Sequence, residues 1–289
     1  PVTVFGINPD GTLYKQAPTT TPVVNYRGEL DDLFLNRGNQ IALAASATYS
    51  LQIPLERANV FGRITYDLSD NVEVFGDVLY TQYDAVASQA FPLVGAVGQS
   101  VRVPVTNPFL PDDVRTLMAS RPNPTAPFNF TTALRPLGVL QYDSSWEVYQ
   151  ITTGLKGRLE ARDWSWDIHV SHGEVDNVDR RVNNASLSII QAFLDAPGGG
   201  ALETDPVRCE GGFNPFGREI SADCAQKIRR DGVTNLNLKQ TFVEANLQGE
   251  LFAMPAGDAR FAIGAGFRRN SYDLRPDEAL QTGDLTGQP

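Results

Sequence analysis

Long runs of strictly alternating side chains constrain the fold of this chain more than any other feature. From Ala58 to Leu68, every second position is apolar or small, and the intervening positions are mostly polar. Alternation with a period of two is a strand signal. Strands of soluble proteins usually have five or six residues, whereas about ten residues cross a bilayer when the strand is tilted. The run of about eleven residues therefore suits a membrane-crossing strand.

Each alternating run is followed by a short turn and a second alternating run, so the pattern predicts hairpins. Ser69-Asp70-Asn71, for example, carries residue types that favour tight turns. The same motif occurs three times along the chain. We therefore expect about six strands, over residues 57–68, 72–84, 146–159, 164–175, 239–252 and 260–273.

The two faces of the expected strands differ in chemistry. One face carries aliphatic, small and aromatic side chains, with aromatic residues near the strand ends at Tyr66, Tyr80, Trp164, Trp166 and Phe261, where membrane girdles belong. A charge facing lipid near the midplane costs about 2–4 kcal/mol. We therefore expect a wet or protein-filled lumen on the opposite face, which holds Arg63, Asp77, Lys156, Asp167, Glu244, Glu250 and Arg268.

The connections between the expected strands are asymmetric. Turns within hairpins are short, whereas residues 85–145 and 177–238 form long connections between hairpins. Short turns on one side and long loops on the other are typical of bacterial outer-membrane barrels, with the turns in the periplasm. We therefore expect an all-β protein that is part of a transmembrane antiparallel β-barrel. A soluble β-sandwich explains the alternation equally well, but it explains the strand lengths and the long loops poorly.

Composition excludes two other classes of protein. No run approaches the roughly 18 uninterrupted apolar residues of a membrane-spanning helix, and mean hydropathy is −0.23. The net charge of −10 argues against a nucleic-acid partner, because phosphate binding needs a basic surface. A composition of 42% hydrophobic residues remains compatible with a barrel, since only every second strand residue meets lipid.

Several shorter features carry local predictions. The only two cysteines, Cys209 and Cys224, suggest one disulfide in an oxidising compartment, with two free thiols as the alternative. Residues 1–50 are interpreted as the end of an earlier extracellular loop. Asn8-Pro9-Asp10-Gly11 is a turn signal, and residues 111–120 are expected to form a short helix between prolines.

Residues that could suggest chemistry have simpler explanations. His169 and His172 would point to opposite faces of a strand, so they cannot chelate one ion together. Gly264-Ala265-Gly266 lacks the third glycine and the helix of a dinucleotide site, and Gly198-Gly199-Gly200 is interpreted as a flexible loop. The acidic residues Glu174, Asp176 and Asp179 favour a solvated surface over a calcium site. We expect no catalytic residues, no metal, no cofactor and no enzymatic activity.

An ordered series of segments resembles the barrel hairpins of TonB-dependent receptors of the Gram-negative outer membrane. The series includes Leu55–Gly62, Asp70–Gly76, Asn107–Pro111 and Val243–Leu251, together with the stretch Cys209-Glu210-Gly211-Gly212-Phe213-Asn214-Pro215-Phe216-Gly217 that leads to Cys224. The resemblance covers most of residues 45–275, and no single motif is diagnostic. It implies an internal segment of a barrel of about 22 strands with a plugged lumen.

The resemblance also implies a function and partners. Such receptors actively take up a scarce nutrient, commonly a ferric siderophore, cobalamin or a carbohydrate, and draw energy from the TonB complex. Contacts with outer-membrane lipid and a nutrient ligand are expected, and Phe109, Arg115, Phe128, Phe213 and Phe216 are plausible ligand contacts that the sequence does not rank. The chain departs from the family pattern in lacking a plug domain, a TonB box and a terminal aromatic strand. Both ends look cut, so contact with TonB would run through other parts of the receptor. The alternative functions are a passive porin-like or structural outer-membrane barrel and a secreted β-sandwich that binds a ligand.

Overall fold

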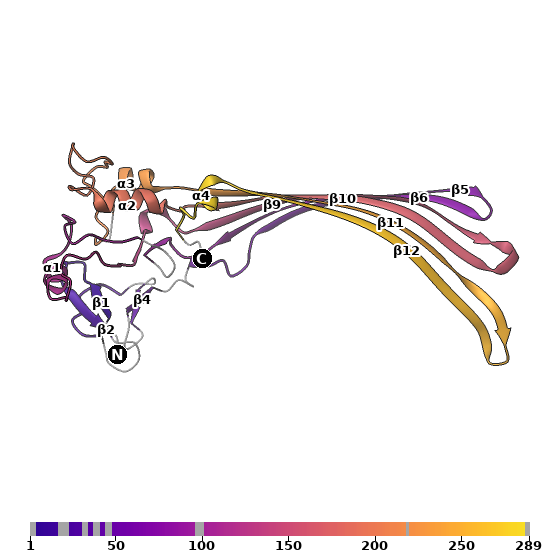
Figure 1. Ribbon diagram of the computed structural model, residues 1–289, viewed down its shortest axis with the longest axis horizontal. Helices are drawn as coiled ribbons and strands as arrows, with labels where there is room; N and C mark the ends of the chain where they lie inside the picture. The colour runs from indigo at the N-terminus through magenta and orange to yellow at the C-terminus, as the bar shows by residue number, and fades with distance from the viewer. Residues whose placement is uncertain are drawn as a thin grey trace.

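The computed structural model describes residues 4–16, 23–30, 34–36, 41–43, 48–95, 101–217 and 220–286. Its main feature is one antiparallel sheet of six long strands, in the order β12-β11-β10-β9-β6-β5. Each long strand pairs with the long strands that precede and follow it in the chain. Three hairpin turns lie at one end of this sheet (Figure 1). The strands are β5 (Leu55–Ser69), β6 (Val72–Ser88), β9 (Gln141–Leu159), β10 (Trp164–Val182), β11 (Gly232–Met254) and β12 (Gly257–Pro276).

All six strands predicted from alternation are present, and the chain is all-β with a few short helices. The predicted bounds hold to within a few residues at the hairpin turns. At the other end the strands continue further than predicted, because β10 runs to Val182 and β11 already begins at Gly232. The long connections are correspondingly shorter than expected and span residues 89–140 and 183–231.

Smaller elements lie at the end of the sheet opposite the hairpin turns (Figure 1). The turn predicted at Asn8–Gly11 is confirmed and joins two short strands, and the helix predicted over residues 111–120 is α1. The short strands are β1 (Val4–Ile7), β2 (Leu13–Gln16), β3 (Phe34–Asn36), β4 (Ile41–Leu43), β7 (Leu93–Val94) and β8 (Thr132–Ala133). The helices are α1 (Asp112–Ala119), α2 (Leu187–Asp195), α3 (Ala222–Ile228), α4 (Glu278–Gln281) and the 3-10 turn η2 (Arg135–Leu137). A further 3-10 turn, η3 (Glu160–Arg162), lies instead in the hairpin turn between β9 and β10.

The buried core of the described chain lies in the long connections and not in the sheet. We call residues 89–140, 183–231 and 277–286 the cap. Apolar side chains from its first two segments pack together around α2 and α3, and Phe193 and Phe213 meet at 5.8 Å between ring centroids. Its core residues include Val94, Val103, Leu134, Leu137, Ile190, Phe193, Leu194, Phe213 and Ile228.

Hydrogen bonds between distant parts of the chain make the cap one unit. Asn107 Nδ2 donates to the carbonyl of Leu194 at 3.1 Å, although 87 residues separate them. The side-chain amide of Gln191 bonds both the N–H and the carbonyl of Arg102, at 2.8 and 2.9 Å. The carboxylate of Asp284 accepts from the N–H of Ser188 at 2.6 Å, which fixes the third segment to the start of α2. The described parts of the long loops are therefore packed against each other.

Candidate membrane-facing surface and cap

Strand register places the predicted apolar side chains on a single face of the six-stranded sheet. Val78, Ile151 and Gly62 lie in one row across β5, β6 and β9, and Leu155 lies beside Ile168. Directly opposed residues of an antiparallel pair point to the same side, so these rows share one face. We call this the Ile151 face, and we call the opposite side the Lys156 face. The sets inferred from alternation thus form one continuous surface.

The apolar surface is open to its surroundings. Ile64 on β5 is 73% exposed and Phe267 on β12 is 68% exposed. Contiguous apolar surface of this kind marks an interaction site, because soluble monomers rarely leave it uncovered. Across the sheet the exposed members include Val60, Ile64, Tyr66, Val78, Ile151, Ile168, Val170, Val243, Ile263 and Phe267.

The apolar surface ends on the side of the cap along a line that runs obliquely across the strands. We call this line the oblique limit. On β5 the apolar residues begin at Ala58, whose row passes through Gln82, Glu147 and Asn237 to Asp273 on β12. On β12 the apolar residues begin only at Phe267. Phe267 lies six residues from Asp273 toward the hairpin turn, which is about 20 Å along the strand at ~3.3 Å per residue. Five strand spacings of ~4.8 Å separate β5 from β12, or about 24 Å. The limit therefore crosses the strands at about 40° from the perpendicular.

Beyond this limit the Ile151 face becomes charged and hydrogen-bonded. Lys239 on β11 pairs with Glu174 on β10 at 3.0 Å, and His172 Nε2 lies 3.4 Å from the same carboxylate. Asn237 Nδ2 donates to Asp176 at 2.6 Å. The change from apolar to polar is abrupt, and it occurs between neighbouring positions of the same face on each strand.

Aromatic residues border the apolar surface near the hairpin turns. Trp164 packs edge-on against Phe261 at 4.9 Å, and its indole N–H donates to the carbonyl of Glu250 at 2.7 Å. The guanidinium of Arg162 lies 5.5 Å from the Trp164 ring centroid. An aromatic body with a satisfied polar atom is suited to a boundary between apolar and aqueous surroundings. The aromatic residues predicted as a girdle thus lie on the Ile151 face.

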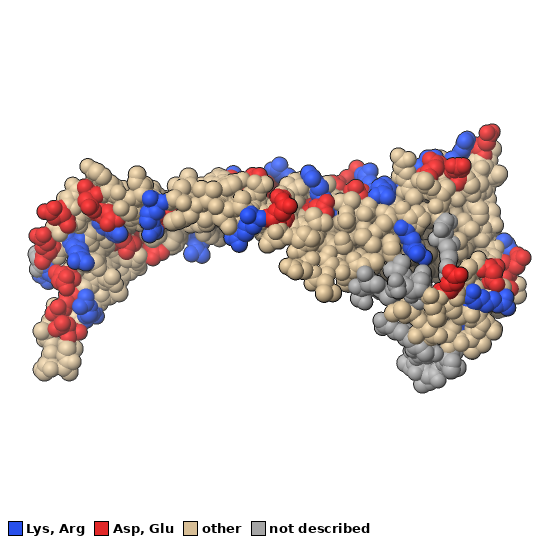
Figure 2. All heavy atoms as spheres, turned by 180° about the vertical axis from the view of Figure 1, so that it is seen from behind, with Lys and Arg blue, Asp and Glu red and all other residues tan. Residues whose placement is uncertain are grey.

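The Lys156 face carries paired charges in its central part. Arg63 donates to both oxygens of Asp77 across the first hairpin, at 2.6 and 2.8 Å. Lys156 on β9 pairs with Glu73 on β6 at 3.0 Å. Figure 2 shows acidic and basic residues interspersed along the molecule, and not gathered into one patch of a single sign. This face therefore suits contact with water or with polar protein groups.

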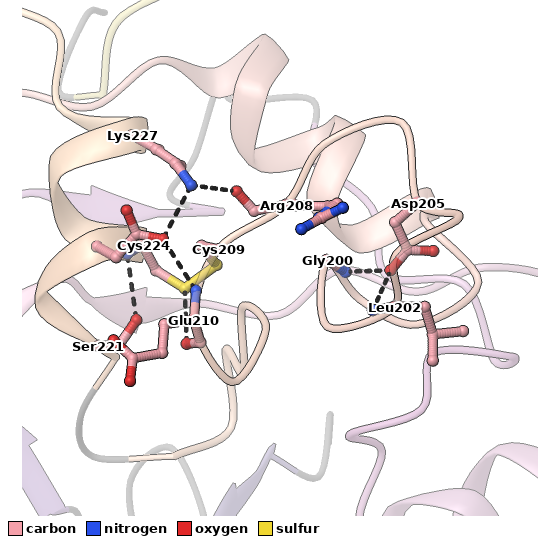
Figure 3. Close-up of a disulfide and its surroundings, with 10 residues drawn as sticks. Gly200, Leu202, Asp205, Arg208, Cys209, Glu210, Ser221, Cys224 and Lys227 are labelled. Carbon is pink, nitrogen blue, oxygen red and sulfur yellow. Dashed lines mark hydrogen bonds and ion pairs between the residues drawn. A yellow bond between two sulfur atoms is a disulfide. The ribbon is translucent and has the colours of Figure 1, made fainter.

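A disulfide joins Cys209 to Cys224 in the cap, as predicted from the sequence. Cys224 lies in α3. Ser221 caps the N-terminus of this helix, and its hydroxyl accepts from the Cys224 N–H (Figure 3). Lys227 of the same helix donates to Asp223 and to the carbonyl of Arg208. The hydrogen bonds from Lys227 and from the Glu210 N–H lower the pKa of the Asp223 carboxyl. The stretch before Cys209 is thereby fixed to α3.

The Gly198-Gly199-Gly200 stretch is a tight buried turn, so the prediction of a flexible loop was wrong. The Asp205 carboxylate accepts from the N–H groups of Gly198, Gly200 and Leu202 at 3.0, 2.8 and 3.1 Å. Burial alone would raise the pKa of Asp205, but the three N–H donors outweigh it and lower the pKa. Gly199 and Gly200 have positive φ angles, which glycine adopts without strain.

The structure separates the residues that could have suggested metal binding. His169 and His172 point to opposite faces, and Nδ1 of His169 lies 3.5 Å from Asp167. Asp179 lies on the opposite face from Glu174 and Asp176, so the three carboxylates do not converge. Among the described residues no group of three or more histidine, cysteine or acidic side chains could hold a metal ion.

The five residues that the sequence offered as ligand contacts differ in their surroundings. Phe213 is fully buried in the cap core, so it cannot touch a ligand without the core opening. Phe128 and Phe216 are partly buried against that core. Arg115 is exposed and donates to the carbonyl of Leu110 at 3.2 Å. Phe109 is half-buried and packs on Gly199. Four of these five residues, the phenylalanines, are therefore accounted for by packing within the cap.

No protein-family model, curated protein or solved structure matches this chain. In the part of the chain that the structure describes, no helix is both long enough and apolar enough to span a membrane.

Proposed function

We propose that the sheet is part of the wall of an outer-membrane β-barrel, with the Ile151 face toward lipid and the Lys156 face toward the lumen. The observation that carries this proposal is the oblique limit of the apolar surface. Strands of membrane barrels tilt by about 35–45° from the barrel axis. A flat membrane surface must therefore cut across the rows of the sheet at a similar angle, and the limit lies at about 40°.

The extent of the apolar surface agrees with a hydrocarbon layer. On β9 the apolar positions of the Ile151 face run from Tyr149 to Leu159, which is about 33 Å along the strand. At a tilt of about 40° this corresponds to a height of about 25 Å, the height of the apolar band of outer-membrane barrels. The aromatic residues Trp164 and Phe261 then lie at its periplasmic edge.

A soluble sandwich accounts less well for the same surface. A sandwich buries one face of its sheet against a second sheet about 10 Å away. Ile64, Phe267 and Ile263 would have to lie in such a core, yet each is more than 60% exposed. Within the described ranges, no second sheet covers the Ile151 face.

The same proposal includes active uptake of a scarce nutrient in the manner of TonB-dependent receptors. The resemblance of the hairpins to that family supports it, as does the ordered cap at the expected extracellular end. The ligand would be a ferric siderophore, cobalamin or a carbohydrate, and the outer membrane of a Gram-negative bacterium would be the location. Energy would come from the TonB complex through parts of the receptor outside this chain.

Two variants of neighbouring residues on β9 test the membrane assignment. Ile151→Asp places a charge toward lipid, whereas Gln150→Asp places it on the lumen side of the same strand. With the protein expressed in a Gram-negative host, we expect the first variant to be depleted from the detergent-extracted outer-membrane fraction and the second to assemble normally. Equal assembly of both variants, or recovery of the native protein in the aqueous phase without detergent, would contradict the proposal. Uptake that persists after deletion of TonB would leave a passive porin-like barrel in its place.

A further inference from the structure

The two faces of the sheet exchange their character beyond the oblique limit. There the Ile151 face carries charges, whereas the Lys156 face carries aromatic and aliphatic side chains. One row of that face runs from Arg57 on β5 through Tyr83, Trp146, Asn177 and Leu236 to Leu274 on β12. The next row runs from Asn59 through Thr81, Val148, Val175 and Leu238 to Tyr272. An apolar surface that faces inward above the lipid needs an occupant other than lipid.

Tyr83 on β6 and Trp146 on β9 form a stacked pair on this surface. Their ring centroids lie 5.7 Å apart with 11° between the ring planes. The indole N–H of Trp146 donates to Ser144 Oγ at 2.7 Å, and Ser144 in turn donates to Asp179. Asn177, which is only 3% exposed, donates to both Ser144 and Asp179 at 3.2 Å. The orientation of the indole is therefore fixed before any ligand arrives.

Polar groups with unused hydrogen-bonding capacity lie on this pair and in the two rows beyond it. The Arg181 guanidinium lies over the Tyr142 ring at 5.6 Å. Within the described ranges, that guanidinium, Asp179 Oδ2 and the Tyr83 hydroxyl have no hydrogen-bond partner. Ala85 and Ala87 lie beside Ser144 and Tyr142 and leave room above the backbone. Neighbours on this face are about 5 Å apart across strands and about 7 Å apart along them, close to the size of one sugar ring.

We propose that Tyr83, Trp146, Asp179 and Arg181 form a binding site for neutral pyranose sugars, which rests on the proposed uptake function and names its substrate class. The apolar C–H face of one pyranose ring stacks on an aromatic ring, and hydroxyl groups of that ring and of its neighbours in an oligosaccharide bond the carboxylate, the guanidinium and the phenol. Among the four residues, one carboxylate and one guanidinium balance in charge. The neighbouring Arg57 on β5, which lies beside Tyr83, donates to Asn59 at 2.9 Å. The site therefore suits a neutral ligand, whereas a ferric chelate with several negative charges would be placed against the Asp179 carboxylate.

The test begins with the purified, detergent-solubilised protein on an array of oligosaccharides built from glucose, galactose, xylose and N-acetylglucosamine. We expect binding of at least one neutral oligomer, with a change in tryptophan emission when that sugar is titrated in solution. Trp146→Ala and Asp179→Asn should each weaken binding at least tenfold. Trp164→Phe, at the opposite end of the other face, should leave the affinity unchanged and serves as the matched control.

The outcomes separate this inference from the proposed function. A protein that assembles in the outer membrane but binds no sugar on the array would overturn the sugar site and leave the receptor proposal standing. Sugar binding that survives both Trp146→Ala and Asp179→Asn would place the site elsewhere and would also overturn the inference. Loss of sugar binding in the two variants, with normal assembly and normal binding by Trp164→Phe, would support it.

Discussion

Trp166 on β10 lies directly over Gly157 on β9, with its indole in the space that a side chain at position 157 would occupy. The two residues are opposed in register, and a Cβ atom at position 157 would lie 2.8 Å from the indole ring and 2.6 Å from the Asn71 carbonyl oxygen. The close approach of the ring and of this backbone oxygen requires glycine here. An aromatic side chain that covers a glycine on the neighbouring strand also helps to fix register.

We therefore expect Gly157→Ala to destabilise the sheet by about 1–3 kcal/mol, because the backbone of Asn71 and the Trp166 ring must both shift. Gly76→Ala is the matched control, since a Cβ atom there would meet only ordinary contacts of 3.4 and 3.9 Å. Urea unfolding of the detergent-solubilised protein, followed by tryptophan emission, measures both. Equal urea midpoints for Gly157→Ala and Gly76→Ala would show that the structure accommodates a side chain at position 157 without cost.

Removal of the disulfide should loosen the cap and spare the sheet. Cys209 and Cys224 enclose a loop with a sequence separation of 15, for which the chain-entropy model gives about 3 kcal/mol. We expect Cys209→Ser to speed proteolysis of residues 198–231 without reducing the β content measured by circular dichroism. We also expect no reaction of the native protein with a thiol label before reduction. Prompt labelling of the unreduced, folded protein would show that both thiols are free.

Acid should open the glycine turn of the cap through Asp205. Its pKa is lower in the folded protein than in the unfolded chain, so its ionised form stabilises the folded state. That stabilisation is complete above about pH 4, the ordinary pKa of aspartate, and is lost as the pH falls through the lower folded value. We expect amide exchange at Gly198 and Gly200 to be slower in the native protein than in Asp205→Asn at pH 6, and the difference to vanish in strong acid. A difference that does not depend on pH would contradict this account.

The alternation in the sequence predicted the six strands well only where one face is uniformly apolar. Between Tyr149 and Leu159 most steps along β9 alternate between apolar or small and polar residues, so the sequence predicts the strand clearly. From Gln141 to Glu147 both faces carry polar residues, so the pattern fades although the hydrogen-bond ladder continues to Ser88 and Val182. The strands were therefore predicted too short at that end.

Features that depend on register or on long-range packing could not be predicted from the sequence. The oblique limit emerges only when Ala58 and Asp273 are known to share a row. The cap core joins Phe193 and Phe213 from stretches without periodicity, and the glycine turn is ordered by a carboxylate several residues away. The Tyr83–Trp146 pair was missed because its two residues lie 63 positions apart and meet only across β6 and β9.

The most direct measurement of the central claim compares two cysteine variants that share one row of the sheet. Ala58→Cys on β5 and Asp273→Cys on β12 lie on the same face and at the same register level. If the strands tilt across a membrane as proposed, a membrane-impermeant maleimide added to intact cells will label position 273 and spare position 58. Equal labelling of the two positions would contradict the tilt, and with it the assignment of the Ile151 face to lipid.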